Sequence, residues 1–263
     1  QILNGDFSQE GVDVIIGGDF SNPSDWTEGN GWSIENGKAT SVGNNLSGSV
    51  YQTIPSVVNK TYKVEIEISD YVSGTLRAIN RGNFVNLPQS NGVHTVYLTT
   101  STSSDNFLYL ESRPFVGSID NVSVVEVGQD WVLTGLATIG NGVASFVDNG
   151  TNLNSSVIQS NAVVADTNYK VSFDVSRYVL GGVQIRVGGA DAVSHHLSQG
   201  VGTYTFYIKS GNSTNFEIKR WGAYPNFDFD ITNITVEEVG QEWVLTDGCS
   251  ITAQGARITS DGT

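Results

Sequence analysis

A loop-like segment, residues 219–228 (KRWGAYPNFD), gathers side chains suited to binding a polar ligand. Its polar and aromatic candidates are Arg220, Trp221, Tyr224 and Asn226. Aromatic rings can stack on the C–H surfaces of sugars, while guanidinium and amide groups hydrogen-bond to hydroxyl groups. A glycine and a proline interrupt the segment, so its rings lack the alternating pattern of a core strand. We predict a ligand contact here, with packing against another subunit or local packing of the loop as alternatives.

An earlier part of the chain carries a shorter counterpart of this segment, Ser112-Arg113-Pro114-Phe115. Arg113 and Phe115 are the candidate ligand contacts in it. The nearby stretches 80–90 and 187–199 have almost nothing in common. Variable stretches on a shared scaffold are typical of binding loops.

No motif in the sequence indicates catalysis. The chain contains no Gly-x-Ser-x-Gly, His-Glu-x-x-His or Cys-x-x-Cys pattern and no glycine loop of the kind that binds phosphate. Paired glycosidase carboxylates meet only in the fold, so their spacing in the sequence does not test for them. We expect a protein that is not an enzyme.

The charge balance argues against two classes of partner. Among 263 residues there are 13 Lys and Arg but 27 Asp and Glu, which gives a formal net charge of −14. Such a field repels the phosphate backbone of nucleic acids and the surface of anionic bilayers. No apolar run is long enough to span a bilayer. We expect no nucleic-acid partner and no insertion into a membrane.

The candidate residues belong to a repeated unit. The segment 124–134 (VVEVGQDWVLT) returns as 236–246 (VEEVGQEWVLT), which places Trp131 and Trp243 112 residues apart. A fixed period indicates modules in series. We predict an N-terminal segment or end of a preceding region (1–16), two β-sandwich repeats (17–128 and 129–240) and the start of a truncated third repeat (241–263).

Alternating apolar and polar residues predict strands in each repeat. Every second residue of 62–68 is apolar, as a strand with one buried face requires, and 169–175 match it. The other predicted strands are 93–99, 106–111, 118–127, 183–187, 203–209, 215–219 and 231–239. Short strands separated by turns at roughly ten-residue spacing predict tandem antiparallel β-sandwiches and an all-β fold. Tyr71 and Tyr178 precede matching turns, and we predict that their hydroxyl groups bond to the backbone.

Short motifs mark the ends of the repeat. They are Leu3-Asn4-Gly5-Asp6-Phe7-Ser8, its echo Gly17-Gly18-Asp19-Phe20-Ser21 followed by Trp26, and the closing segment 117–124 (GSIDNVSV). These motifs resemble the two ends of jelly-roll carbohydrate-binding modules. With the Val-Gly-Gln-Asp-Trp joint they are also similar to repeat modules of virion structural and tail-fibre proteins of tailed phages. The resemblance implies jelly-roll sandwiches at a virion surface or another extracellular location.

The resemblance also implies a metal site. In the carbohydrate-binding family a structural calcium often lies between an acidic residue of the first strand and an Asp of the last strand, here Asp19 and Asp120. Carboxylates and carbonyl groups suit calcium, which takes six to eight oxygen ligands. The second repeat has Thr232 in place of Asp120, so any calcium is expected in the first repeat only. The alternative is a hydrogen-bonding role for Asp120, and no other cofactor is expected.

These observations lead to one functional prediction and two alternatives. We predict a non-catalytic virion fibre or surface-appendage protein that works in adhesion, with host-surface polysaccharide, other virion subunits and copies of itself as partners. The first alternative is a purely structural capsid or tail decoration protein that binds no glycan. The second is the accessory binding region of a secreted polysaccharide-degrading enzyme.

Overall fold

The chain folds into two compact units, one of residues 10–129 and one of residues 1–9 together with 130–263. We call them the repeat-1 unit and the repeat-2 unit. The computed structural model describes residues 2–43, 48–151, 154–189, 193–197, 200–240, 249–252 and 255–258. Within these ranges the regular structure is β-strand apart from one short 3-10 turn, η1 (Pro23–Asp25), and no helix could cross a membrane. The predicted all-β class is confirmed.

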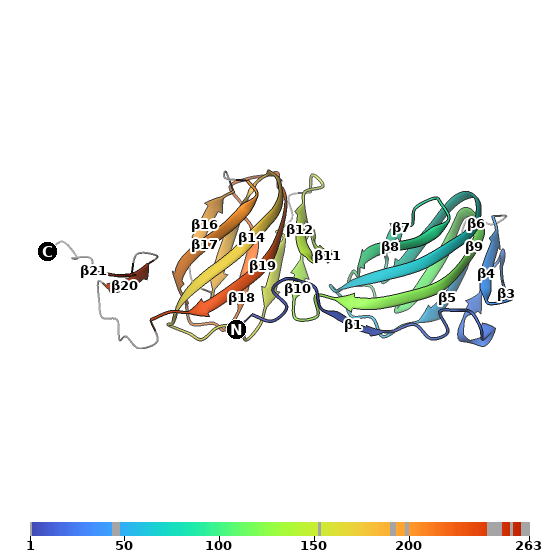
Figure 1. The fold of residues 1–263 in the computed structure, drawn as a ribbon, viewed down its shortest axis with the longest axis horizontal. Helices are drawn as coiled ribbons and strands as arrows, with labels where there is room; N and C mark the ends of the chain where they lie inside the picture. Colours follow the sequence, from blue (N-terminus) through green and yellow to red (C-terminus); the bar gives the residue numbers. More distant parts are fainter. Residues whose placement is uncertain are drawn as a thin grey trace. The chain divides into compact units, whose positions relative to one another are not determined.

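Up to residue 240, the strands of the repeat-2 unit form a sandwich of two five-stranded antiparallel sheets (Figure 1). In order across the first sheet, the strands are β10 (Val132–Thr134), β13 (Ser156–Gln159), β18 (Phe216–Arg220), β15 (Gly182–Val187) and β16 (Val193–His196). Across the second sheet they are β11 (Ala137–Gly140), β12 (Val143–Val147), β19 (Asp228–Glu238), β14 (Asn168–Leu180) and β17 (Gly202–Lys209). Spatial neighbours are mostly distant in sequence, as in a jelly roll.

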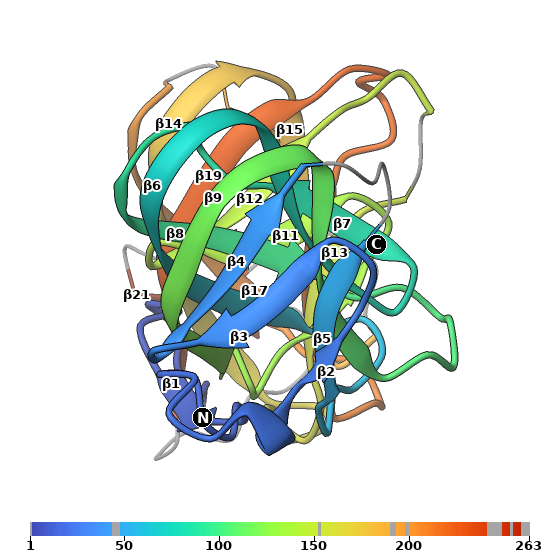
Figure 2. The same ribbon diagram turned by 90° about the vertical axis from the view of Figure 1, so that its right-hand side faces the viewer.

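The repeat-1 unit follows the same path with two long, curved strands (Figure 2). These are β6 (Thr61–Asn80) and β9 (Phe107–Val127), which pair with each other along their lengths. Shifts in register between Ser69 and Thr75 let each strand contribute to both layers. The layer that carries the candidate site contains β2 (Thr27–Glu28), β5 (Ser49–Thr53), β7 (Asn83–Asn86), the start of β9 and the end of β6. The other layer contains β1 (Glu10–Asp13), β3 (Trp32–Glu35), β4 (Lys38–Val42), β8 (Gly92–Thr99) and the remaining halves of the two long strands.

Alternation along the strands builds the core. In β6, Val64, Ile66 and Ile68 are buried while the residues between them face outward, since successive side chains of a strand point to opposite faces. The two tyrosines before the turns act as predicted: the Tyr71 hydroxyl donates to the carbonyl of Gly74 (3.0 Å), and the Tyr178 hydroxyl donates to the carbonyl of Gly181 (3.4 Å).

Residues 1–9 complete the repeat-2 unit although the whole repeat-1 unit separates them from it in sequence. The Ile234 amide donates to the carbonyl of Gly5 (2.9 Å), and the Trp131 indole donates to the carbonyl of Asn4 (3.0 Å). The predicted boundaries kept 1–16 apart from both repeats. The structure instead divides this stretch, because residues 1–9 dock on the repeat-2 unit while β1 pairs with β9 in the repeat-1 unit.

Most of the predicted third repeat, including Trp243, lies outside the described residues. Its described part is a hairpin of β20 (Cys249–Thr252) and β21 (Gly255–Ile258).

Candidate functional site

Three aromatic side chains lie on the solvent side of the β5–β9 ladder in the repeat-1 unit. Leu108 and Leu110 of β9 are fully buried, so Phe107 and Tyr109, which alternate with them, point to the other face and are half-buried. Tyr51 of β5 stands directly opposite Tyr109 in the ladder and is half-buried as well. We call Tyr51, Phe107 and Tyr109 the aromatic face.

The three rings of the aromatic face support one another. The Tyr51 centroid lies 5.2 Å from that of Tyr109 and 5.6 Å from that of Phe107, and the Phe107–Tyr109 separation is 5.7 Å. Burial, together with the nearby carboxylate of Asp105, raises the pKa of the Tyr109 phenol. The phenol therefore keeps its proton over the neutral range and can exchange hydrogen bonds with hydroxyl groups.

Beside these rings lies a guanidinium cluster made of Arg77 and Arg113 around Glu111. Arg113 donates two hydrogen bonds to the two Glu111 carboxylate oxygens (2.8 and 3.0 Å), and an Arg77 nitrogen lies 3.9 Å from the same carboxylate. Arg77 also donates to the Asn86 amide oxygen (3.1 Å) and lies 4.3 Å from the ring centroid of the exposed Phe84. The Glu111 side chain is only 9% exposed whereas that of Arg113 is 40% exposed. The carboxylate thus holds two guanidinium groups in place at the surface.

The repeat-2 unit lacks this aromatic surface. At the positions that match Tyr51, Tyr109 and Glu111 in the ladder it has Ile158, Glu217 and Lys219. Arg186 and Glu217 form an ion pair there (3.8 Å). The two units therefore share a scaffold but present different chemistry on the same sheet.

The structure brings together three of the four residues predicted on the 219–228 loop. The rings of Trp221 and Tyr224 meet edge to face at 5.1 Å, and the Tyr224 amide donates to the Trp221 carbonyl (3.1 Å). Arg220 is only 5% exposed: it donates to the carbonyl of Tyr224 (3.3 Å) and lies 5.3 Å from the Phe227 ring centroid. Arg220 therefore supports the loop from inside and does not suit a ligand contact, while Asn226 is exposed.

The structure places the two candidates predicted in the first repeat differently. Arg113 belongs to the guanidinium cluster. Phe115 is 1% exposed and packs between Trp32 and Tyr71, at 6.1 Å from each ring centroid. The prediction of a ligand contact at Phe115 is corrected, because its ring fills the core.

The proposed calcium ligands have local partners. The Asp19 carboxylate accepts the amide (3.1 Å) and the hydroxyl (2.8 Å) of Ser21, and these bonds lower its pKa. The Asp120 carboxylate accepts the amide of Asn121 (2.7 Å). The described residues contain no group of three or more His, Cys, Asp or Glu side chains that could hold a metal. A calcium ion would therefore depend on backbone carbonyl oxygens.

In the repeat-2 unit a side-chain hydroxyl group donates to the corresponding carbonyl groups. There the Thr232 hydroxyl donates to the carbonyl of Gly142 (2.7 Å) and approaches that of Asp6 (3.5 Å). In the repeat-1 unit Asp120 stands in the sequence where the repeat-2 unit has Thr232, and Gly37 lies beside the Asp19 carbonyl as Gly142 lies beside that of Asp6. A carboxylate cannot donate as the Thr232 hydroxyl does, so calcium at this position of the repeat-1 unit stays a prediction that a binding measurement can test.

We expect calcium to stabilise the repeat-1 unit through Asp120. At a hundredfold excess over its Kd, calcium would add about 2.7 kcal/mol to the free energy of unfolding. Calorimetric melting with calcium and with a chelator measures this. In Asp120→Thr, which copies the second repeat, the calcium-dependent increment should disappear. Equal calcium-induced shifts in the wild type and in Asp120→Thr would contradict the assignment.

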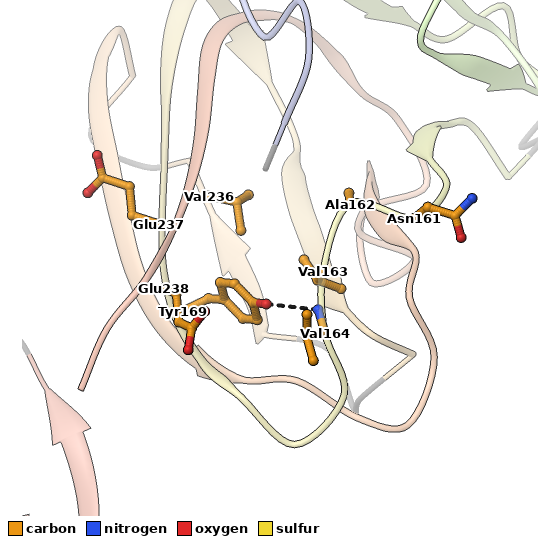
Figure 3. Close-up of a pocket in the computed structure, with 8 residues that line it drawn as sticks. All are labelled: Asn161, Ala162, Val163, Val164, Tyr169, Val236, Glu237 and Glu238. Carbon is orange, nitrogen blue, oxygen red and sulfur yellow. Dashed lines mark hydrogen bonds between the residues drawn. The ribbon is translucent and has the colours of Figure 1, made fainter. Parts of the chain in front are cut away.

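A pocket of about 400 Å³ lies in the repeat-2 unit, and its lining includes Val164 and Tyr169 (Figure 3). Its central bond runs from the Val164 amide to the Tyr169 hydroxyl (2.8 Å). The repeat-1 unit has the same bond, from the Val57 amide to the Tyr62 hydroxyl (2.9 Å). Because both units share it, we assign this bond to the fold.

Sequence reasoning missed the three residues of the aromatic face. A usable signal was present: in 107–111 (FLYLE) the leucines alternate with larger or charged residues, which predicts two aromatic side chains on one face of a strand. Tyr51 could not be added to them from the sequence, since only the pairing of β5 with β9 brings it there.

Neither a protein-family model nor a curated protein matches the chain. Among solved structures it is similar to the N-terminal CBM22-1-CBM22-2 tandem domain from Paenibacillus barcinonensis Xyn10C, with 11% identity over 88% of this chain and 99% of that chain and a TM-score of 0.30. An anti-sigma factor domain-containing protein matches with 12% identity over 84% of this chain and 91% of that chain, at a TM-score of 0.21. Likenesses at these TM-scores carry no argument about function.

Proposed function

We propose that the chain is a non-catalytic glycan-binding protein that uses the aromatic face of the repeat-1 unit. The observation that carries this proposal is the set of three half-exposed rings beside two guanidinium groups on one sheet. Rings offer a flat apolar surface to the C–H side of a sugar, while guanidinium and phenol groups can hydrogen-bond to its hydroxyl groups.

The state of Glu111 supports a binding role over a catalytic one. Glycoside hydrolysis typically uses a pair of carboxyl groups that flank the scissile bond and are open to the substrate. Both oxygens of Glu111 already accept hydrogen bonds from Arg113. A carboxylate engaged in this way holds and orients the two cations beside the aromatic face.

The setting that we propose is a fibre or surface appendage of a virion, outside the cell. Tandem sandwich units and a strongly acidic composition suit a series of repeated modules whose surfaces face water. Its partners would be host-surface polysaccharide, other virion subunits and further copies of the chain.

One observation favours an architectural role for part of the chain. The repeat-2 unit has Ile158, Glu217 and Lys219 where the repeat-1 unit has its aromatic rings and carboxylate. We propose that the repeat-2 unit acts mainly as a spacer, with the Trp221–Tyr224 pair as its candidate contact.

Tyr109→Ala in the full chain is expected to weaken glycan binding at least about tenfold, or ~1.4 kcal/mol, because it removes one of the three rings of the aromatic face together with its phenol hydroxyl. A glycan array identifies the ligand, and isothermal titration measures the affinity. Glu217→Ala changes the position of the repeat-2 unit that matches Tyr109; it is the matched control and should bind like the wild type. Loss of binding in Trp221→Ala but not in Tyr109→Ala would place the binding site on the 219–228 loop. If the wild type binds none of the bacterial-surface and algal polysaccharides on the array, the result would favour a structural decoration protein that binds no glycan.

A further inference from the structure

The two units hold the same short motif in the same way. In the repeat-2 unit, Gln159 clamps Leu3: its amide oxygen accepts the Leu3 amide (2.8 Å) and its amide nitrogen donates to the Leu3 carbonyl (2.9 Å). In the repeat-1 unit, Gln52 makes the same pair of bonds with Ile16 (both 3.1 Å). We call residues 2–8 the docked segment, and Trp131, Gln159 and Ile234 its receiving site.

The remaining contacts repeat as well. The Val122 amide donates to Gly18 (2.9 Å) as the Ile234 amide does to Gly5, and the Trp26 indole donates to Gly17 (2.8 Å) as the Trp131 indole does to Asn4. Phe7 packs on Trp131 at 5.2 Å, and Phe20 packs on Trp26 at 4.9 Å. The receiving site therefore recognises a backbone shape and one aromatic ring.

The backbone conformation of the docked segment restricts which residues it can contain. A Cβ on Gly5 would lie 2.1 Å from the Ile234 carbonyl oxygen, and one on Gly18 would lie 2.0 Å from that of Val122, so both positions require glycine. Phe7 and Phe20 have φ angles of 54° and 49°, in the left-handed region. Few unrelated peptides would meet these requirements.

The two units make the same contacts with the motif, but the chain connects the motif to its tryptophan partner differently in each. Phe20 precedes its Trp partner by a few residues, whereas Phe7 is separated from Trp131 by the entire repeat-1 unit. The pairing of Glu10 with Val127 nevertheless anchors the chain just after residue 9 close to Trp131, so a chain's own segment is tethered near its receiving site without being joined to it directly.

We propose that the receiving site of the repeat-2 unit can also take residues 1–9 of a second copy of the chain, which links the two copies. This is an exchange of an identical element between protomers. A chain's own segment competes with the segment of the second copy at an effective concentration on the order of millimolar. Exchange is therefore favoured where the chain's own segment is displaced or where the local concentration of the protein is high.

Two complementary full-length variants test the exchange. Phe7→Ala keeps the receiving site but weakens its own segment, and Trp131→Ala keeps the segment but damages the site. Mixed together, they are expected to form a complex of twice the mass of one chain in native mass spectrometry and light scattering, while each alone stays monomeric. If Gly5→Ala is added to the Trp131→Ala chain, the complex should be lost. A mixture that remains monomeric at millimolar concentration would overturn the proposal.

A second measurement avoids the variants in case either fails to fold. Wild-type chain is mixed with several millimolar of a peptide of residues 1–9, and hydrogen exchange of residues 2–8 is followed by mass spectrometry. Displacement predicts faster exchange of these amides with the wild-type peptide and no change with its Gly5→Ala version. Equal exchange with both peptides would refute a specific receiving site.

Discussion

Phe7→Ala is expected to lower the free energy of unfolding of the repeat-2 unit by about 3–5 kcal/mol, although residue 7 is far from that unit in sequence. Phe7 is 2% exposed and packs on the fully buried Trp131. Its loss leaves a cavity against Trp131 and frees the docked segment, which then no longer covers the Gln159 amide. Scanning calorimetry measures the melting, and hydrogen exchange assigns each transition to a unit.

Phe20→Ala is the matched control, because Phe20 packs on Trp26 in the repeat-1 unit as Phe7 does on Trp131. It should lower the stability of the repeat-1 unit and leave the amides of 130–240 protected. If Phe7→Ala instead accelerated exchange in 10–129 and spared 130–240, the assignment of residues 1–9 to the repeat-2 unit would be wrong.

The sequence predicted the strands well because one buried face leaves a strong alternating pattern. The predicted strands 93–99, 183–187 and 203–209 lie within β8, β15 and β17. Predicted strands 106–111 and 118–127 form one strand, β9, because Arg113 and Val116 continue the pairing with β6 through shifts in register that break the alternation.

The sequence could not show which repeat the Leu3-to-Ser8 motif completes. Both copies of the motif have similar sequences. The residues that bind them, such as Gln52 and Gln159, are recognisable only from their tertiary contacts. For the same reason, only part of the candidate site could be predicted from the sequence. Arg113 was found beside its proline, but its partner Glu111 and the cross-strand Arg77 depend on the register of β6 with β9.

Glu111→Ala is expected to lower the stability of the repeat-1 unit and to weaken glycan binding together. Removing one partner of a buried ion pair costs about 3–5 kcal/mol, but Arg77 and Arg113 are 27% and 40% exposed, so solvent reduces the expected loss to ~1–3 kcal/mol. The two guanidinium groups would then repel each other and lose their orientation beside the aromatic face. Urea denaturation measures the first effect, and titration with the glycan found for the wild type measures the second.

Two variants separate charge from shape in this prediction. Glu111→Gln keeps the size and one acceptor oxygen, so its loss of stability should be smaller than that of Glu111→Ala. Lys219→Ala changes the matching position of the repeat-2 unit and should leave glycan binding intact. Because the repulsion between Arg77 and Arg113 is electrostatic, added salt should return part of the stability lost in Glu111→Ala. A Glu111→Ala chain that binds glycan as the wild type does would show that Glu111 holds these cations without any consequence for the ligand.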